Sequence, residues 1–471
     1  MAVLFARIDD RIRKNTAHIK KPATIIGMIM VVMLPSLIKA NDLFPIPPQI
    51  EKNVDFWTKI YSQYSSNHVV VHDKNDLSVI YTVINLNEFY ADSIHLSVKW
   101  DVVEEVKSEH RRILQKLSEI NSPPSLDSLS KEERHVFILW SHSDDPYKFS
   151  KARYAVRAQL GLRDRFRESI KRSGYYKENI DRIFKYYDLP LELTYLPHVE
   201  SLFDYTSYSK VGAAGIWQFI YHTGRLFMNV NYAVDERLDP ITATDGAARL
   251  LKKNYKELQS WPLAITAYNH GLNGMRNAKT RLKTDDFGVI YEKYQGPMFG
   301  FASKNFYAEF LAAWHVAANY KAYFGAIELY PSKKYQSIKL QENIYIKQLA
   351  THFKVPIDTL IAYNPAFRRA VISNATPVPR GYVLRLPYRE GFDPREALVQ
   401  RTKPLPPTRT VQRKSKPILL TQNLSEVDSV TNNADMEKYI LHKLQSETTP
   451  PLVDEKETDP AKALSTNVQA N

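Results

Sequence analysis

The sequence predicts a mainly α-helical protein with a small C-terminal α+β module. Apolar residues recur at helical spacing among charged ones in Val102–Leu117. A second, almost wholly apolar and aromatic helix is expected at Phe301–Tyr320, where it would close the core of a helical domain. The pattern changes in residues 335–387, which predict a strand, two short helices and a closing strand.

The composition restricts the class of partner. The chain has 471 residues, enough for two or three domains, and 64 basic against 51 acidic residues give a net charge of +13. A basic protein favours an anionic partner such as nucleic acid, an acidic membrane surface or the bacterial wall. No nucleic-acid-binding motif is present, so we expect no nucleic-acid partner. The absence of cysteine excludes disulfides and thiolate metal sites, and we expect no metal and no other cofactor.

Residues 1–40 are typical of a targeting segment. An uncharged apolar run at residues 23–38 follows six basic residues, namely Arg7, Arg11, Arg13, Lys14, Lys20 and Lys21. As a helix this run would be about 24 Å long, short of the roughly 30 Å hydrocarbon core, and Pro35 interrupts it. We expect a signal peptide cleaved near Ala40. The alternative is an uncleaved inner-membrane anchor, and either would export residues 41–471.

Residues 41–180 are expected to form a mostly helical N-terminal region. The elements expected in it are an aromatic helix around Val54–Tyr64, a strand at His68–His72, a strand or helix at Ser78–Ile84, and helices at Val102–Leu117, Leu129–Trp140 and Tyr154–Ile170. His68 and His72 would share one face of their strand. No third histidine lies near them in the sequence, so we expect no metal site there.

Glu200 is the centre of the candidate catalytic stretch. Leu193, Leu196 and Phe203 place it on one apolar face of a helix expected to begin near Asp188. An ionised Glu is costly to bury without a partner, although a half-exposed or Arg-paired Glu at a helix end would also fit. Apolar neighbours, and to a smaller extent the helix dipole, would raise its pKa from about 4.3 toward 6 or 7. Such an acid can protonate a glycosidic oxygen at neutral pH.

Most glycosidases use two carboxylates, and a second one is not evident here. The nearby acids are Asp204, Asp235, Glu236 and Asp239. We interpret Asp235 and Arg237 as a structural charge pair, and Asp239-Pro240 as the start of a helix. If no second carboxylate faces Glu200, the substrate must supply the nucleophile.

Two further motifs follow Glu200. The run from Gly212 to Gly215 would let the backbone approach a ligand closely, and Gln218 offers an amide for sugar hydroxyl or acetamido groups. Trp217 fits either a sugar-stacking face or plain core packing. Tyr268 could hydrogen-bond Glu200 and orient it, whereas Asn269 and Gly271 could be only a helix cap.

These motifs, in this order, resemble those of the lytic transglycosylase (SLT) family, which has a lysozyme-like helical fold. They are Glu200-Ser201-Leu202-Phe203, Gly212-Ala213-Ala214-Gly215-Ile216-Trp217-Gln218 and Ala267-Tyr268-Asn269. The resemblance implies that Glu200 protonates the leaving oxygen of the MurNAc–GlcNAc bond and then deprotonates the MurNAc C6 hydroxyl, which attacks C1. A 1,6-anhydromuropeptide would result, without water or metal. Ser201, Gln218, Tyr268 and Asn269 would support substrate binding, while His270–Asn273 departs from the usual glycine- and glutamate-containing run.

The resemblance also implies a domain order. The catalytic domain would span residues 181–325, and residues 335–388 resemble a LysM glycan-binding module. A binding module beside a wall-cleaving domain would raise the effective concentration of peptidoglycan glycan strands, the expected partner. Residues 395–471 are expected to be a disordered, basic, proline-rich tail.

Two other functions remain open at this point. A lysozyme-like hydrolase that uses water predicts a second acid near Glu200. A non-catalytic wall-binding protein would keep the groove and bind sacculi without cleaving them. All three readings place the protein in the periplasm or at a membrane of a Gram-negative-type envelope.

Overall fold

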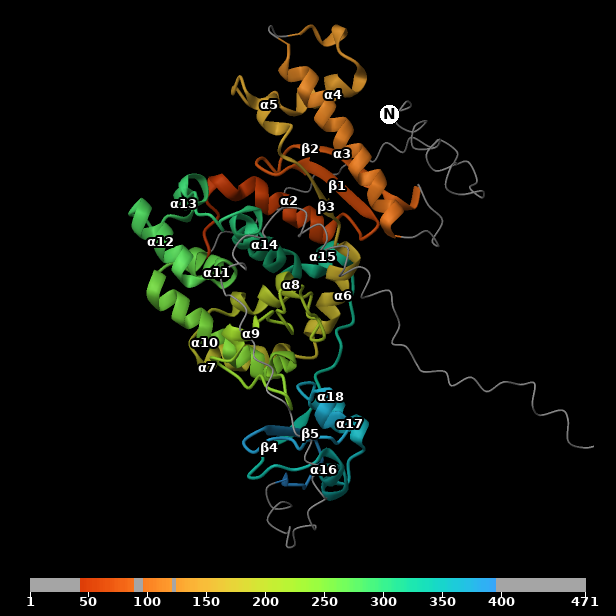
Figure 1. Ribbon diagram of the computed structural model, residues 1–471, viewed down its shortest axis with the longest axis vertical. Coiled ribbons are helices and arrows are strands. Elements are labelled where there is room, and N and C mark those ends of the chain that lie inside the picture. The colour runs from red at the N-terminus through yellow and green to blue at the C-terminus, as the bar shows by residue number, and fades with distance from the viewer. Residues whose placement is uncertain (1–42, 89–95, 121–123, 395–471) are drawn as a thin grey trace, which may run out of the picture. The chain divides into compact units, whose positions relative to one another are not determined.

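The computed structural model describes residues 43–88, 96–120 and 124–394, and these are mainly helical (Figure 1). The mainly α prediction is therefore confirmed. The targeting segment 1–40 and the tail 395–471 lie outside the described residues. Short 3-10 turns link the larger elements of the described part of the chain, at Pro48–Ile50, Leu86–Glu88, Leu126–Ser128, Leu191–Tyr195 and Glu236–Leu238. No helix within the described ranges is long and apolar enough to cross a membrane.

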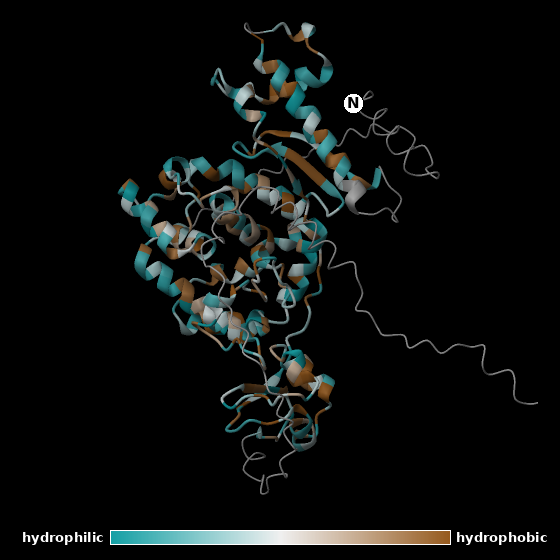
Figure 2. Ribbon diagram, viewed as in Figure 1, coloured by the Kyte–Doolittle hydropathy of each residue, from teal (hydrophilic) through white to brown (hydrophobic). Residues whose placement is uncertain are grey.

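A three-stranded antiparallel sheet forms the centre of the N-terminal region, in the order β2-β1-β3. Its strands are β1 (His68–Asp73), β2 (Ile80–Asn85) and β3 (Val156–Leu160). The strand expected at His68–His72 is confirmed, and the run that fitted either a strand or a helix forms β2. β1 is strongly hydrophobic (Figure 2), and its valines are fully buried.

β3 corrects the helix expected at Tyr154–Ile170. Residues 156–160 pair with β1, with Val69 opposite Leu160 and Asp73 opposite Val156, and the helix α6 (Arg163–Ser173) begins only afterwards. All five residues of β3 are buried, including Arg157 and Gln159. The alternation of apolar and polar residues in Val156–Leu160 is only five residues long, and the pairing partner of this strand lies far away in the sequence.

Helices surround this sheet. α2 (Glu51–Ser62) precedes it, and α3 (Leu96–Ser118), α4 (Lys131–Leu139) and α5 (Lys148–Ala152) lie between β2 and β3 in the chain. α4 begins with a capping box, in which Ser130 and Glu133 satisfy each other's backbone N–H groups. The helix expected at Leu129–Trp140 is thereby confirmed, with its first turn slightly later.

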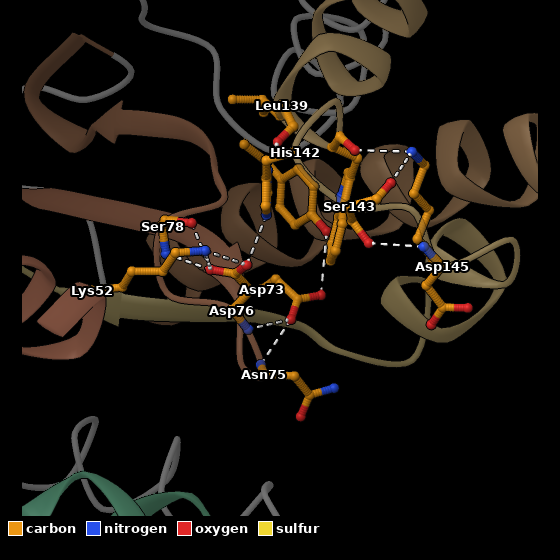
Figure 3. A network of polar contacts seen from close by, with 12 residues as sticks. Lys52, Asp73, Asn75, Asp76, Ser78, Leu139, His142, Ser143 and Asp145 are labelled. Carbon is orange, nitrogen blue, oxygen red and sulfur yellow. Dashed lines mark hydrogen bonds and ion pairs between the residues drawn. The ribbon is translucent and has the colours of Figure 1, made fainter. Parts of the chain in front are cut away.

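A polar network ties α2 to the β1–β2 hairpin and to the end of α4 (Figure 3). The Asp76 carboxylate accepts from Lys52 Nζ at 3.1 Å and lies 2.9 Å from His142 Nε2. Burial would raise the pKa of Asp76, but hydrogen bonds from Ser78, His142 and Lys52 lower it to about 2. Its neighbour Asp73 is more enclosed, and burial raises its pKa to about 6. The network is structural, since it fixes a hairpin to its neighbours.

The helical region that contains Glu200 begins at α6 and ends at α15. The other helices are α7 (Lys177–Tyr186), α8 (Leu196–Glu200), α9 (Tyr221–Gly224), α10 (Pro240–Leu258), α11 (Trp261–His270), α12 (Leu272–Leu282), α13 (Phe287–Lys293), α14 (Phe301–Ala318) and α15 (Tyr320–Phe324). α14 packs against α2, α8 and α11, and most of its residues are buried. The prediction that this helix closes the core is confirmed, and α2 belongs to the same core.

The C-terminal module confirms the expected β-α-α-β order, with one extra short helix. Its elements are β4 (Tyr335–Lys339), α16 (Ile346–Phe353), α17 (Ile357–Tyr363), α18 (Arg369–Ile372) and β5 (Val383–Pro387). β4 and β5 pair antiparallel, with Ile338 opposite Leu384. The module has its own core of buried residues, and Val234 from the preceding region belongs to that core.

Candidate active site

Glu200 is the last residue of the short helix α8. A 3-10 turn at Leu191–Tyr195 leads into α8, so the continuous helix expected from Asp188 is divided into two short pieces. Leu193 and Leu196 are fully buried, as the apolar stripe predicted, while Glu200 is half-buried. The chain turns immediately after it, because Leu202 and Phe203 adopt left-handed φ values of 53° and 57°. A carboxyl group is thereby held at a sharp turn, between core and solvent.

The electrostatic influence of Glu200 reaches two tyrosines. Burial raises the pKa of Tyr268 on α11 well above its ordinary value, and the negative charge of Glu200 raises it further. Burial also raises the pKa of Tyr61 on α2 well above its ordinary value, and the charges of Glu309 and, to a smaller extent, Glu200 raise it further. Glu200 therefore lies close to aromatic hydroxyl groups contributed by two separate helices.

The glycine-rich turn that follows is built around two positive φ angles. Gly212 and Gly215 have φ values of 76° and 78°, a conformation that favours glycine. A side chain at Gly215 would place its Cβ 1.8 Å from the Arg237 carbonyl oxygen, whereas the space around Gly212 is open within 4 Å. The sequence predicted that the backbone here approaches a ligand closely. At Gly215 the backbone instead lies against Arg237, in another part of the chain.

The predicted supporting residues converge on the backbone of this turn. Ser201 Oγ donates to the Ile216 carbonyl at 3.1 Å, and the Tyr268 hydroxyl donates to the Trp217 carbonyl at 2.8 Å. Gln218 Nε2 donates to the carbonyls of Gly215 at 2.8 Å and Ser207 at 3.2 Å. The hydrogen bond that the Tyr268 hydroxyl donates therefore goes to the backbone of the turn.

Trp217 and Asn269 have roles that the sequence left open. Trp217 is fully buried, stacks on Phe184 and donates from Nε1 to Thr244 Oγ1 at 2.8 Å, so it is a core residue. Asn269 is exposed and accepts a hydrogen bond from Ser303 on α14 at 2.9 Å. Gly271, with φ 88°, is the cap of α11.

The acids after the glycine-rich turn are structural, as predicted. Asp235 accepts from Arg237 Nε at 2.9 Å and Nη2 at 2.8 Å, and both side chains are buried. Asp239 caps α10 by accepting from the backbone N–H groups of Ile241 and Thr242, each at 3.0 Å. Arg237 also donates from Nη1 to the Gly212 and Phe219 carbonyls, at 2.7 and 3.0 Å. One guanidinium therefore joins both ends of the turn.

Glu309 on α14 is a second carboxyl group that the sequence reasoning missed. Burial raises its pKa to about 8, which the charge of Arg157 lowers only in part. Glu309 and Glu200 both act on Tyr61, so they share one neighbourhood. The available signal was that Glu309 is the single acid in Phe301–Tyr320, which was interpreted wholly as core. Among the described residues, no group of three or more His, Asp or Glu side chains could hold a metal ion.

His198 also lies beside the site. It is buried in α8 against Phe166 and Phe203, and Ser169 Oγ lies 2.7 Å from its Nδ1. Burial lowers its pKa to about 3. This folded-state pKa lies below the unfolded value of about 6.5. The neutral ring therefore contributes its full stability above pH 6.5, and this stability is lost progressively as the pH falls from 6.5 toward the folded-state pKa.

His198→Phe should therefore flatten the loss of stability under acid. We expect the difference in unfolding free energy between wild type and variant to shrink by up to about 1.4 kcal/mol per pH unit below pH 6.5. Urea unfolding at pH 7, 6 and 5 measures it, with exposed His222→Gln as control. Comparison with wild type removes the opposite contribution of Asp73, whose raised pKa stabilises the fold at lower pH. If the unfolding free energies of wild type and His198→Phe changed in parallel with pH, the lowered pKa of His198 would be contradicted.

Two family matches agree with this geometry. Residues 179–289 match the Transglycosylase SLT domain, and residues 334–396 match the LysM-like domain of lytic transglycosylase MltD. Both matches correspond to regions described above. The chain therefore contains an SLT domain followed by an MltD-type LysM-like domain, as the resemblance implied.

Individual relatives are more distant. The chain is 38% identical over 108 residues to membrane-bound lytic murein transglycosylase D of Escherichia coli K12, which is 21% of this chain and 24% of that protein. It is 29% identical over 107 residues to a putative tributyltin chloride resistance protein of an Alteromonas species, a match that covers 22% of this chain and 52% of that protein. The structure of the E. coli 70 kDa soluble lytic transglycosylase Slt70 superposes with a TM-score of 0.27 at 16% identity, and the superposition covers 48% of this chain and 35% of that chain. The match spans about a quarter of the first relative's length.

Proposed function

We propose that this protein is a peptidoglycan lytic transglycosylase that cleaves the MurNAc–GlcNAc β-1,4 bond without water. The observation that supports this most is the position of Glu200 at the end of α8, beside a turn whose backbone is held by Ser201, Gln218 and Tyr268. The SLT match covers all five of the proposed site residues. We further propose that the protein is exported and acts on glycan strands in the periplasm or at a membrane.

The chemistry assigns both proton transfers to Glu200. Its protonated carboxyl donates to the glycosidic oxygen as the bond from that oxygen to C1 breaks. The resulting carboxylate accepts the proton of the MurNAc C6 hydroxyl while the C6 oxygen bonds to C1. Glu200 ends as it began, and the products together contain the atoms of the substrate with no added water.

Product mass decides between this reaction and hydrolysis. The exported protein incubated with sacculi should release fragments that end in 1,6-anhydro-MurNAc, one water lighter than hydrolytic fragments. Reducing MurNAc ends would replace the proposal with a lysozyme-like hydrolase. Binding to sacculi without release would favour a non-catalytic wall-binding protein.

Glu309 is the observation that favours the hydrolase as a second candidate, because a second carboxyl group shares the neighbourhood of Glu200. A nucleophile or base at this position must be ionised. With a pKa of about 8, Glu309 is mostly protonated at pH 7, which argues against that role. A hydrolase that used Glu309 would gain activity as pH rises through 8, and Glu309→Gln would abolish the gain.

Tyr268→Phe should lower turnover on sacculi roughly tenfold and leave the Michaelis constant nearly unchanged. The variant loses the hydroxyl that holds the Trp217 carbonyl, so the turn beside Glu200 is less well positioned. Tyr307→Phe is the matched control, because that hydroxyl also donates to a carbonyl at 2.8 Å, but to Pro45. An effect of Tyr268→Phe on affinity alone would make Tyr268 a sugar contact.

A further inference from the structure

The LysM-like module is continuous with the catalytic region through residues 231–239. Val234 is fully buried in the core of the module and forms a β-bridge with Phe367. Backbone hydrogen bonds on either side of it run from Asp235 N to the Ala366 carbonyl at 2.8 Å and from Arg368 N to the Ala233 carbonyl at 3.1 Å. The segment is thus paired with the module almost as an added strand would be.

A buried ion pair strengthens the same junction. Arg385 on β5 contacts Asp239 through Nη1, and the two side chains are 8% and 2% exposed. Arg385 Nη2 also lies within hydrogen-bond distance of Thr242 on α10, at 3.3 Å. The Arg385 backbone is fixed by Asn364, which accepts from its N–H and donates to its carbonyl, each at 2.8 Å. A charge pair with so little exposure is costly to break from one side only.

Residues 231–239 also contact the glycine-rich turn. Arg237 lies between Asp235 and Asp239 in the chain, and it joins the Gly212 and Phe219 carbonyls. The carbonyl of Arg237 fills the space where Gly215 has no side chain. A continuous set of packed and hydrogen-bonded groups therefore runs from the module to the turn that supports Glu200.

We propose that Arg385 is a positioning residue for the catalytic turn, and that the LysM-like module braces the active site through it. This inference rests on the proposed transglycosylase function. A module that serves only as a tether raises local substrate concentration, so its loss changes affinity for sacculi. A module that braces the turn changes the turnover of substrate that is already bound.

Arg385→Met in the full exported chain tests the proposal, with Arg389→Met as the matched control. Arg389 donates to the carbonyls of Phe353 and Lys354, so it stabilises the module without reaching residues 231–239. We expect Arg385→Met to lower kcat on the order of tenfold, with the fraction bound to sacculi unchanged. Arg389→Met should change neither. A loss of binding alone, or equal effects of the two variants, would overturn the proposal.

A second readout is independent of activity. Amide hydrogen exchange in residues 212–219 should become faster in Arg385→Met and stay unchanged in Arg389→Met. If wild type releases no fragments from sacculi, the transglycosylase proposal fails, while the exchange data still decide whether the module braces the turn. Unchanged exchange in Arg385→Met would overturn the brace even if the enzyme is active.

A double variant addresses failure to fold. Arg385→Met leaves Asp239 buried without its partner, which can destabilise the chain. Asp239→Asn with Arg385→Met removes both charges and keeps an oxygen that can cap α10. We expect this variant to fold and still show faster exchange at residues 212–219. A folded double variant with wild-type exchange and kcat, or one that does not fold, would contradict a specific role in positioning the turn.

Discussion

Glu200→Gln should abolish the release of soluble muropeptides from sacculi and leave the fold and wall binding intact. A glutamine is nearly isosteric with a protonated glutamate, so the half-buried position at the end of α8 should accept it. It cannot deliver a proton to the glycosidic oxygen or take one from the C6 hydroxyl. Loss of general acid and base chemistry costs roughly 100- to 10,000-fold for each role, so we expect turnover below detection.

The measurement combines product release with pelleting of protein on sacculi. Glu178→Gln, an exposed acid near the start of α7, is the control for loss of one negative charge. Glu309→Gln is informative as well, because Glu309 is already mostly neutral at pH 7 and its replacement should reduce activity far less. If Glu200→Gln retained turnover, the acid would have been misassigned and Glu309 would be the next candidate.

Gly215→Ala should be the most destabilising change in the glycine-rich turn. The new Cβ would overlap the Arg237 carbonyl oxygen, which is backbone and has no flexible side chain to move away. The left-handed φ adds strain of about 1–2 kcal/mol for a residue with a side chain. We expect a loss of roughly 3–5 kcal/mol of unfolding free energy, with turnover lost even where the protein remains folded.

Gly212→Ala is the matched control for this prediction. Its φ is nearly the same, but a side chain there meets open space, so only the backbone strain should remain. Urea unfolding of the two variants measures the contribution of the close approach to Arg237. Equal losses for the two variants would mean that Gly215 and Arg237 separate easily, and the turn would then be less rigid than its contacts indicate.

Local patterns in the sequence predicted much of the helical fold and the burial of the residues that lead into Glu200. The apolar stripe of Leu193 and Leu196 predicted where Glu200 would lie, and the residues after Asp239 predicted the start of α10. The β-α-α-β order of the module was also visible, because each of its elements has its own periodicity. Such features depend on neighbours a few residues away.

Features that depend on distant partners were not predictable in this way. β3 is a strand because it pairs with β1, more than eighty residues earlier, and the alternation of apolar and polar residues in Val156–Leu160 is too short to predict a strand by itself. The Tyr268 hydroxyl donates a hydrogen bond to the Trp217 carbonyl, and tertiary packing determines this partner. Residues near Glu309 in its own helix are apolar, whereas the groups that it influences, such as Tyr61, lie on other helices that pack against α14.

The placement of Val234 has a consequence for how such a protein can be divided. A fragment cut after α15 would expose this apolar side chain and leave Asp239 without Arg385. Recombination between genes usually moves domains that fold independently, with boundaries in exposed linkers. Here the boundary drawn along the chain differs from the boundary of the folded unit. The SLT domain and its module should therefore be inherited together, and a foreign module should replace the native one only if it provides a pocket for Val234 and a cation for Asp239.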